Sequence, residues 1–183
     1  YQSPTDMGVN RAGDCIIDDE VVREAAKNEI LRRYYQELYR QRRGKSDGRE
    51  IYRIELLMKE LSLTAQSRAV VPPALEMEEL THAPAAAIQL PDGKLLTGKT
   101  SSLLGAASAL LLNALKYMGG IDSEAHLIAP EVIEPVQELK VNVLGNNNPL
   151  LHIDELLVAL SICAVTHPNA KIAIEQLKNL RGS

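Results

Sequence analysis

One segment of the sequence has the spacing of a phosphate-binding loop. Residues 93–100 read G-K-L-L-T-G-K-T, which matches the pattern G-x-x-x-x-G-K-[ST], and an apolar helical segment follows. In a true phosphate loop, backbone amides wrap the phosphates, the lysine supplies charge and the hydroxyl binds Mg²⁺. Here Pro91, Asp92 and Gly93 form a turn signal and strand-like residues follow it. We therefore favour a β-hairpin over a nucleotide loop.

A related possibility is an anion site at the start of the next helix. Four polar residues precede the apolar stretch 103–118: Lys99, Thr100, Ser101 and Ser102. Free amides at a helix start, with a lysine beside them, favour a phosphate or a carboxylate. We therefore name these four residues as candidate ligand-binding residues. The alternative is that the hydroxyl groups only cap the helix.

The opening segment is a second candidate ligand-binding region. Residues 5–13 are polar and contain two glycines, which is typical either of a flexible lead-in or of an ordered ligand loop. If the loop is ordered, we expect Asp6 and Asn10 to provide polar contacts to the same anion.

The other reactive side chains form no recognisable catalytic pattern. His126, His152 and His167 lie in separate segments without an H-x-E or C-x-x-C partner, so the sequence predicts no metal site. Ser101, Ser102 and Cys163 are candidate nucleophiles by residue type alone. Cys163 lies in an apolar helix, where an inert core thiol is expected.

Two charged regions have ordinary structural interpretations. His152, Asp154 and Glu155 start a predicted helix, where a capping cluster is favoured over acid/base chemistry. The arginine-rich stretch 32–53 is interleaved with glutamates, which indicates a solvated helix face and not a nucleic-acid groove.

The composition is that of a globular protein. Hydrophobic residues make up 45% of the 183 residues, charged residues 24%, and the net charge is -4, so no basic field points to nucleic acid. Two distant cysteines cannot form a disulfide framework, which favours a reduced, cytoplasmic protein. The apolar runs are too short to span a bilayer. The sequence starts with Tyr1, so we expect it to be a piece of a longer protein.

Residues 1–82 are predicted to form a helical subdomain with a loop-rich lead-in. Apolar positions four residues apart indicate a long helix that begins after Asp18 or Asp19, and a second helix joined to it by a short polar loop. Two prolines can open a third. The expected helices are 18–43, 51–61 and 72–80.

Residues 83–183 are predicted to form a small α/β subdomain, which makes the fold class α+β. Two short apolar runs flank the turn at Gly93 and predict the hairpin, and a sheet this small needs further strands from elsewhere. The hairpin and the buried helix after it are similar to the opening of the deaminase-like topology, without its zinc ligands. The expected elements are strands 85–90, 94–97 and 126–129 and helices 103–118, 130–143, 153–165 and 168–180.

Several long motifs resemble a bacterial family of uncharacterised proteins, domain of unknown function 1846. They are residues 3–10 (SPTDMGVN), 18–25 (DDEVVREA), 90–93 (LPDG), 97–105 (TGKTSSLLG) and 133–140 (IEPVQELK). The resemblance covers essentially the whole chain. It implies that this chain is the C-terminal part of a longer protein whose missing N-terminal part is Rossmann-like, with its own glycine-rich segment. It also implies strand-like sequence beyond Arg181.

The resemblance carries no established activity, so three functional hypotheses stand. The leading one is an anion or phosphorylated-ligand site shared with the missing part. The rival is a structural or oligomerisation module in which four tyrosines of the first helix pair dock a second copy: Tyr34, Tyr35, Tyr39 and Tyr52. The third is peptide hydrolysis, with Ser102 as the residue to test. In the loop 145–152, Asn147 and Leu150 stand where the resemblance implies that relatives often have His and Arg. A catalytic role of that loop is therefore disfavoured in this protein.

Overall fold

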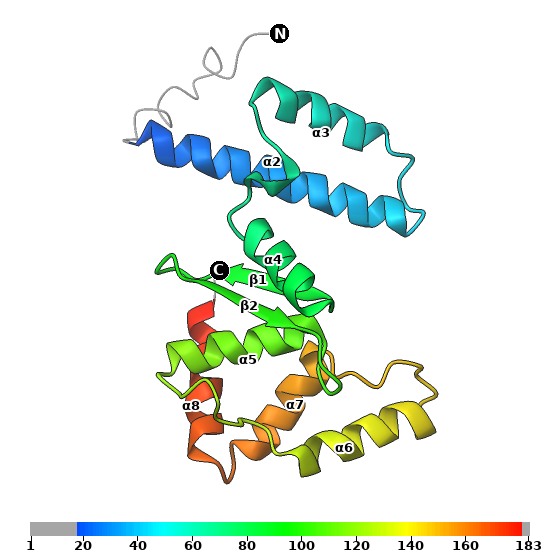
Figure 1. Cartoon of the computed structure of the whole chain (residues 1–183), viewed down its shortest axis with the longest axis vertical. Coiled ribbons are helices and arrows are strands. Elements are labelled where there is room, and N and C mark those ends of the chain that lie inside the picture. Colours follow the sequence, from blue (N-terminus) through cyan, green and yellow to red (C-terminus); the bar gives the residue numbers. More distant parts are fainter. Residues whose placement is uncertain (1–17, 181–183) are drawn as a thin grey trace, which may run out of the picture. The chain divides into compact units, whose positions relative to one another are not determined.

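The computed structural model describes residues 18–180. Contacts divide the chain into two compact units, Tyr1–Arg68 and Ala69–Ser183, whose elements are shown in Figure 1. Helices predominate among the described residues, and a two-stranded sheet lies in the second unit. The α+β class is therefore confirmed, whereas the subdomain boundary at residue 82 stays a prediction.

The first unit starts with the long helix α2 (Asp19–Arg42). Its first amides would lack acceptors within the helix, but the Asp18 carboxylate accepts hydrogen bonds from the amides of Glu20 and Val21 at 3.1 and 3.0 Å. Of the two aspartates named for the start of this helix, Asp18 is therefore the cap.

The second helix of this unit, α3 (Arg49–Glu60), contacts α2, and a short 3-10 turn, η2 (Ala65–Ser67), follows it. The core of the pair is small. Leu31, Ile51 and Met58 are its buried apolar side chains among the described residues, each no more than 7% exposed. A helix pair with so few buried side chains gains little stability of its own.

The second unit begins with α4 (Val71–Thr81) and the antiparallel strands β1 (Ala85–Gln89) and β2 (Leu95–Lys99). Between the strands, Gly93 adopts φ +84, a conformation that glycine reaches without steric cost. The predicted hairpin is confirmed. Figure 1 shows α4 against one face of the hairpin and α5 (Ala106–Met118) against the other.

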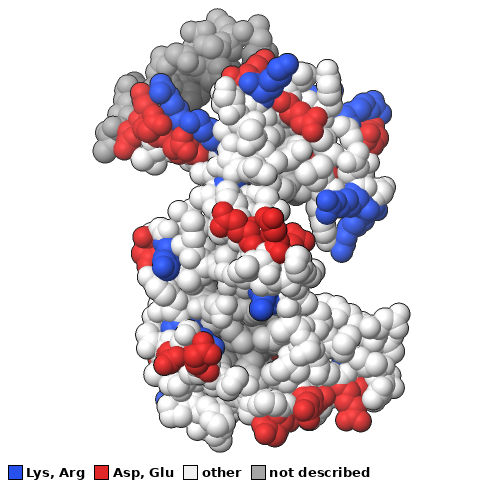
Figure 2. Space-filling model, in the orientation of Figure 1, with Lys and Arg blue, Asp and Glu red and all other residues white. Residues whose placement is uncertain are grey.

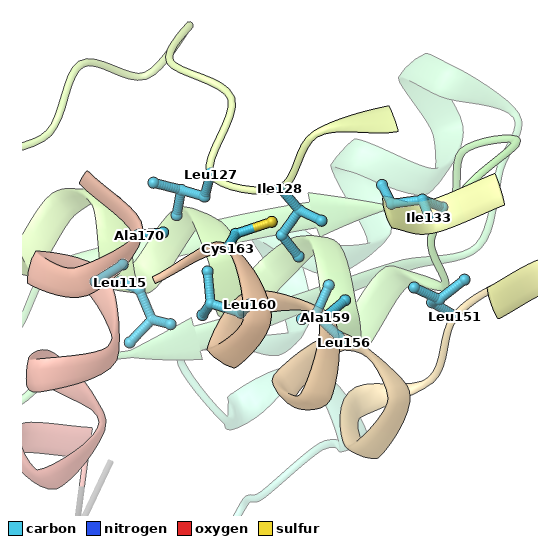
Figure 3. Close-up of a cluster of buried hydrophobic side chains, with 11 residues drawn as sticks. Leu115, Leu127, Ile128, Ile133, Leu151, Leu156, Ala159, Leu160, Cys163 and Ala170 are labelled. Carbon is cyan, nitrogen blue, oxygen red and sulfur yellow. The ribbon is translucent and has the colours of Figure 1, made fainter. Parts of the chain in front are cut away.

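Helices built around one apolar cluster complete the unit. They are α6 (Pro130–Glu138), the π-helical turn η3 (Leu139–Val143), α7 (Ile153–Cys163), α8 (Pro168–Gln176) and the 3-10 turn η4 (Leu177–Leu180). Figure 3 shows the cluster, in which Leu115, Leu156 and Leu160 are fully buried. Cys163 is part of it, as expected, and is 3% exposed.

Two expected elements differ from the structure. The helix predicted for residues 103–118 begins at Ala106, because Leu104 forms an isolated parallel bridge with Leu151. The strand predicted for residues 126–129 does not form; Leu127 and Ile128 are instead buried in irregular backbone against the helices. Their apolar character reflects burial in the core and not pairing in a sheet.

The helix predicted for residues 153–165 forms as α7, which has a buried and an exposed side. Leu156, Ala159 and Leu160 are 0% exposed, whereas Val158 and Ile162 are 60% and 54% exposed. Of the helices that the structure describes, none combines the length and the apolarity needed to cross a bilayer.

Candidate functional site

The segment that matches the phosphate-loop pattern is a hairpin and not a loop around a phosphate. Gly93 lies in the turn, where the Asp92 carboxylate accepts a hydrogen bond from the Lys94 amide at 2.9 Å. The residues that follow are extended in β2, and Lys99 is the last residue of that strand. The interpretation of residues 93–100 as a hairpin is confirmed, and the nucleotide-loop alternative was wrong.

Most backbone amides between β2 and α5 already have acceptors. The Ser101 hydroxyl accepts hydrogen bonds from the amides of Leu103 (3.3 Å) and Leu104 (3.1 Å). The amide of Ser101 in turn donates to the Leu104 carbonyl at 2.9 Å, and that of Thr100 to the Pro84 carbonyl at 2.8 Å. Ser101 therefore stabilises a turn that precedes the helix, and it does not cap the helix itself.

The residue at the N-cap of α5 is Gly105, which has no side chain to offer. The Leu151 carbonyl lies at this helix end: it accepts hydrogen bonds from the Gly105 amide at 3.3 Å and from the Ser108 hydroxyl at 2.9 Å. Within the described part of the chain, the amides of Ala106 and Ala107 keep no acceptor. The free amides thus lie several residues beyond the position expected from the sequence.

The candidate ligand-binding residues fall into two groups. Lys99 and Ser102 are exposed and Thr100 is half-buried, all in the connection between β2 and α5. No carboxylate lies within 4.0 Å of the Lys99 ammonium group among residues 18–180. Asp6 and Asn10 lie outside the described residues, so their proposed contribution stays a prediction.

An open cleft of about 540 Å³ lies beside the first residues of β2, at the opposite end of the strand from Lys99. The sequence did not predict this cleft. Its lining residues are Lys94, Leu95, Leu96, Thr97, Asn113, Lys116, Tyr117, Ile121, Ser123 and Glu124. Two of these side chains form hydrogen bonds to backbone carbonyls of other lining residues. The Asn113 amide group donates to the Thr97 carbonyl at 2.9 Å, and Lys116 Nζ donates to the Ser123 carbonyl at 2.7 Å. The cleft could only be found once α5 was placed on the hairpin.

A buried ion pair between η3 and α7 was also missed. The ammonium group of Lys140, whose side chain is 5% exposed, donates to Glu155 Oε2 at 2.8 Å and to the Leu150 carbonyl at 2.7 Å. The same carboxylate oxygen accepts a hydrogen bond from the His152 amide at 2.9 Å. The pair therefore ties the π-helical turn to the start of α7.

The ion pair decides the protonation state of Glu155. Burial of the carboxyl group works to raise its pKa, but hydrogen bonds from Lys140 and from the His152 amide, together with the Lys140 charge, outweigh burial. The net result is a pKa below the usual 4.5. Glu155 is thus an ionised, structural carboxylate at neutral pH. Separately, no three His, Cys, Asp or Glu side chains of residues 18–180 gather as a metal-binding group would require.

The fold and these sites define a mixed α+β module without a recognisable catalytic centre among the described residues. Two family models match the sequence: "Domain of unknown function DUF1846, N-terminal" over residues 1–62 and "Domain of unknown function DUF1846, C-terminal" over residues 66–183. The chain belongs to the DUF1846 family, which confirms the resemblance seen in the motifs.

Relatives of the same family are considerably longer than this chain. UPF0371 proteins from Corynebacterium urealyticum and Corynebacterium efficiens are 52% and 54% identical over 182 residues. A UPF0371 protein from Streptococcus uberis is 47% identical over 183 residues. Each match covers 100% of this chain but 37% of the relative. The chain thus spans just over a third of the length of these relatives.

Proposed function

We propose that this chain is an assembly module, whose exposed apolar surfaces are covered by the remaining part of a longer polypeptide. The observation that carries the proposal is the outer face of α7. Val158 and Ile162, four residues apart on α7, are 60% and 54% exposed, and Val165, in the turn that follows the helix, is 83% exposed. Apolar side chains grouped in this way on a protein surface mark an interaction site more often than chance exposure.

A second exposed group supports the same function. Val143 and Leu144, at the end of η3, are 71% and 72% exposed. On the face shown in Figure 2, acidic side chains of this unit gather in separate patches, and wide areas without charged side chains lie between them. Because the relatives carry almost two thirds of their length outside this region, their own polypeptide supplies ample surface to cover these residues.

Replacing Ile162 by glutamate in the full-length protein is expected to lower the free energy of unfolding by about 2 kcal/mol, because a charge would enter a covered apolar interface. Asn169→Glu, at an exposed polar position in the first turn of α8, is the control and should change it by less than about 0.5 kcal/mol. Denaturant unfolding measures both. Equal, small effects of the two substitutions would show that α7 faces water and would contradict the proposal.

A second copy of the chain is the other candidate for covering exposed surface. Two of the four tyrosines named for this role are occupied within the first unit: the Tyr34 hydroxyl donates to Glu55 at 3.4 Å and that of Tyr35 to the Ala65 carbonyl at 2.7 Å. Tyr39 and Tyr52 are 55% and 63% exposed and remain available for oligomerisation. Light scattering of the full-length protein over a range of concentrations distinguishes a homo-oligomer from a monomer.

An anion site at the start of α5, shared with a Rossmann-like remainder, is the second candidate function. Among residues 18–180, the amides of Ala106 and Ala107 have no acceptor and Lys99 has no carboxylate partner, and both observations favour it. Thr100, Ser102, Asp6 and Asn10 would add polar contacts, and Ser101 would contribute through the turn it stabilises. The Leu151 carbonyl at the same helix end counts against it, because its negative end repels an anion.

Thermal-shift measurements of the full-length protein with inorganic phosphate, nucleotides and sugar phosphates test this second function. Lys99→Ala should abolish a ligand-dependent rise in Tm of several degrees, while Lys94→Ala, at an exposed lysine outside the candidate site, should preserve it. An unchanged Tm with every anion, or equal loss in both variants, would leave only the assembly function.

We extend the proposal to the topology of the second unit, to the cellular location and to nucleic-acid partners. The hairpin with α5 packed on it supports a deaminase-like topology, whose remaining strands would come from outside this chain. A cytoplasmic location fits a sequence with two distant cysteines, which cannot form a disulfide framework. A net charge of -4 supports the absence of a nucleic-acid partner.

A further inference from the structure

The hydrogen-bond pattern of the hairpin shows which backbone groups of β2 point away from β1. The Leu90 amide donates to the Lys94 carbonyl, and the Thr100 amide donates to the Pro84 carbonyl, at the two ends of the ladder. Hydrogen-bonded pairs in an antiparallel ladder recur at every second residue, so Leu96 and Gly98 are the β2 residues bonded to β1.

The residues between them therefore turn their amides and carbonyls to the outer edge of β2. Leu95, Thr97 and Lys99 are these residues. The Asn113 side chain confirms the direction, because it reaches the Thr97 carbonyl from α5. Among the described residues, that bond is the only one made by this edge; the three outward amides have no acceptor.

Within the described part of the chain, helices cover both faces of the sheet, but no backbone pairs with the outer edge of β2. Helices α4 and α5 lie on opposite faces of the hairpin (Figure 1), and each contacts both strands. Two strands enclosed by helices on both sides make an incomplete layer, because a sheet of this kind normally has several strands. An unpaired edge between covered faces is also a template for further pairing, which proteins normally protect.

The open cleft lies along the same edge. Leu95, Leu96 and Thr97 form its β2 side, while Asn113 and Tyr117 come from α5. Its volume of about 540 Å³ and its mixed lining, with apolar Ile121 beside polar groups, suit an extended segment that hydrogen-bonds through its backbone.

We infer that the outer edge of β2 receives an additional strand, supplied by the part of the same polypeptide that lies outside this chain. The inference rests on the proposed assembly function and specifies one of its contacts. The occupant is assigned to the same polypeptide because the relatives carry most of their length outside this region, and because tethering raises the effective concentration of such a strand far above that of a second copy.

The added strand has a defined set of partners. It would accept hydrogen bonds from the amides of Leu95, Thr97 and Lys99. The Asn113 bond to the Thr97 carbonyl can persist, since a carbonyl oxygen has two lone pairs. Alternate side chains of the strand would face Leu96 and Ile121 in the cleft, so they should be apolar, and the others should be polar.

Residue-resolved amide hydrogen exchange of the full-length protein tests the inference. The amides of Leu95, Thr97 and Lys99 are expected to exchange at least about 100-fold more slowly than unstructured amides, close to the inner amides of Leu96 and Gly98. Fast exchange of the three outward amides beside slow exchange of the two inner ones would overturn the inference. This measurement needs no substitution, so it does not depend on a variant that folds.

A pair of proline substitutions locates the added strand. Thr97→Pro removes an outward amide of β2, and Ala87→Pro removes the outward amide of its cross-strand partner on β1. Neither substitution breaks the β1–β2 ladder, because proline is tolerated where the amide points away from the partner strand. Loss of protection at Leu95 and Lys99 is expected for Thr97→Pro alone, and equal loss in both variants would overturn the assignment to β2.

Two further readouts separate this inference from the assembly function. Side-chain footprinting of Ile162 in the same protein reports whether α7 is covered: protection there with fast exchange at β2 would overturn the strand and leave the assembly function standing. Light scattering gives the oligomeric state. Protection at β2 that persists in a monomer supports a strand from the same polypeptide, and protection that disappears on dilution would assign it to a second copy and overturn the inference.

Discussion

Replacing Gly98 by valine is expected to destabilise the second unit by about 3 kcal/mol or more, although valine is among the best strand formers. A Cβ atom on Gly98 would lie 2.2 Å from the backbone nitrogen and 2.5 Å from the Cα atom of Leu110. These are backbone atoms of α5, so no side-chain rotation can relieve the overlap. The helix would have to move away from the hairpin that it covers.

The size of the effect can be graded with a smaller substitution and a control. Gly98→Ala meets the same backbone atoms and should cost about 2 kcal/mol or more. Gly105→Ala places its Cβ 3.9 Å from the nearest atom outside its neighbours, the Leu151 carbonyl oxygen, at φ -69, and should cost less than about 1 kcal/mol. Denaturant unfolding of the full-length protein, followed by far-ultraviolet circular dichroism, compares the three variants. Wild-type stability of Gly98→Ala would show that α5 does not approach β2 this closely.

Gly98 also shows that a motif can be recognised in a sequence while the structural role of its residues cannot. In residues 93–100 the two glycines stand where a phosphate loop has them, yet Gly93 serves a turn and Gly98 permits close approach of a helix. The turn is a local feature, so Asp92 and Gly93 sufficed to predict the hairpin. The helix that packs on Gly98 lies later in the chain, and no local pattern reveals that contact.

The starts of the helices also differ in whether local or distant residues determine them. Asp18 caps α2 through amides two and three residues away, so the cap could be predicted from neighbouring residues. The start of α5 could not, because the Leu103 carbonyl accepts a hydrogen bond from the Leu151 amide and the Leu151 carbonyl accepts one from the Gly105 amide. This long-range pairing keeps residues 103–105 out of the helix, although Leu103 and Leu104 are apolar enough for one.

Lys140 is the clearest residue that sequence reasoning missed. A lysine in an amphipathic helical pattern is expected in water. Its burial follows from the π-helical turn and from acceptors supplied by Leu150 and Glu155, which come later in the chain. One available signal was Pro135 inside the predicted helix, because a proline there removes a helical hydrogen bond and favours irregular geometry nearby.

Removing Glu155 is expected to be the more damaging way to break this ion pair. Glu155→Ala leaves a buried ammonium group with only the Leu150 carbonyl, and should lower the free energy of unfolding by about 3 kcal/mol. Lys140→Met fills the same space without a charge. It leaves a carboxylate whose side chain is 32% exposed and still bonded to the His152 amide, and should cost about 1 kcal/mol.

A double variant and a surface pair serve as controls. Lys140→Met combined with Glu155→Ala should be more stable than Glu155→Ala alone, because the unpaired buried charge is gone. Glu24→Ala breaks a bond of similar length to Lys27, at 2.6 Å, but both side chains are well exposed, so the loss should not exceed about 0.5 kcal/mol. Denaturant unfolding at neutral pH measures all four proteins. Equal costs for Glu155→Ala and Glu24→Ala would show that burial adds nothing to the pair.

The pH dependence of the same variants separates the charge of Glu155 from its packing. The pKa of Glu155 in the folded chain lies below the usual 4.5, so the folded state binds fewer protons than the unfolded state. The stabilisation is fully present above pH 4.5 and is lost as the pH falls through the lower, folded-state pKa. The stability difference between wild type and Glu155→Ala should therefore shrink on acidification below that point. A difference that stays constant would assign the effect of Glu155 to the shape of its side chain alone.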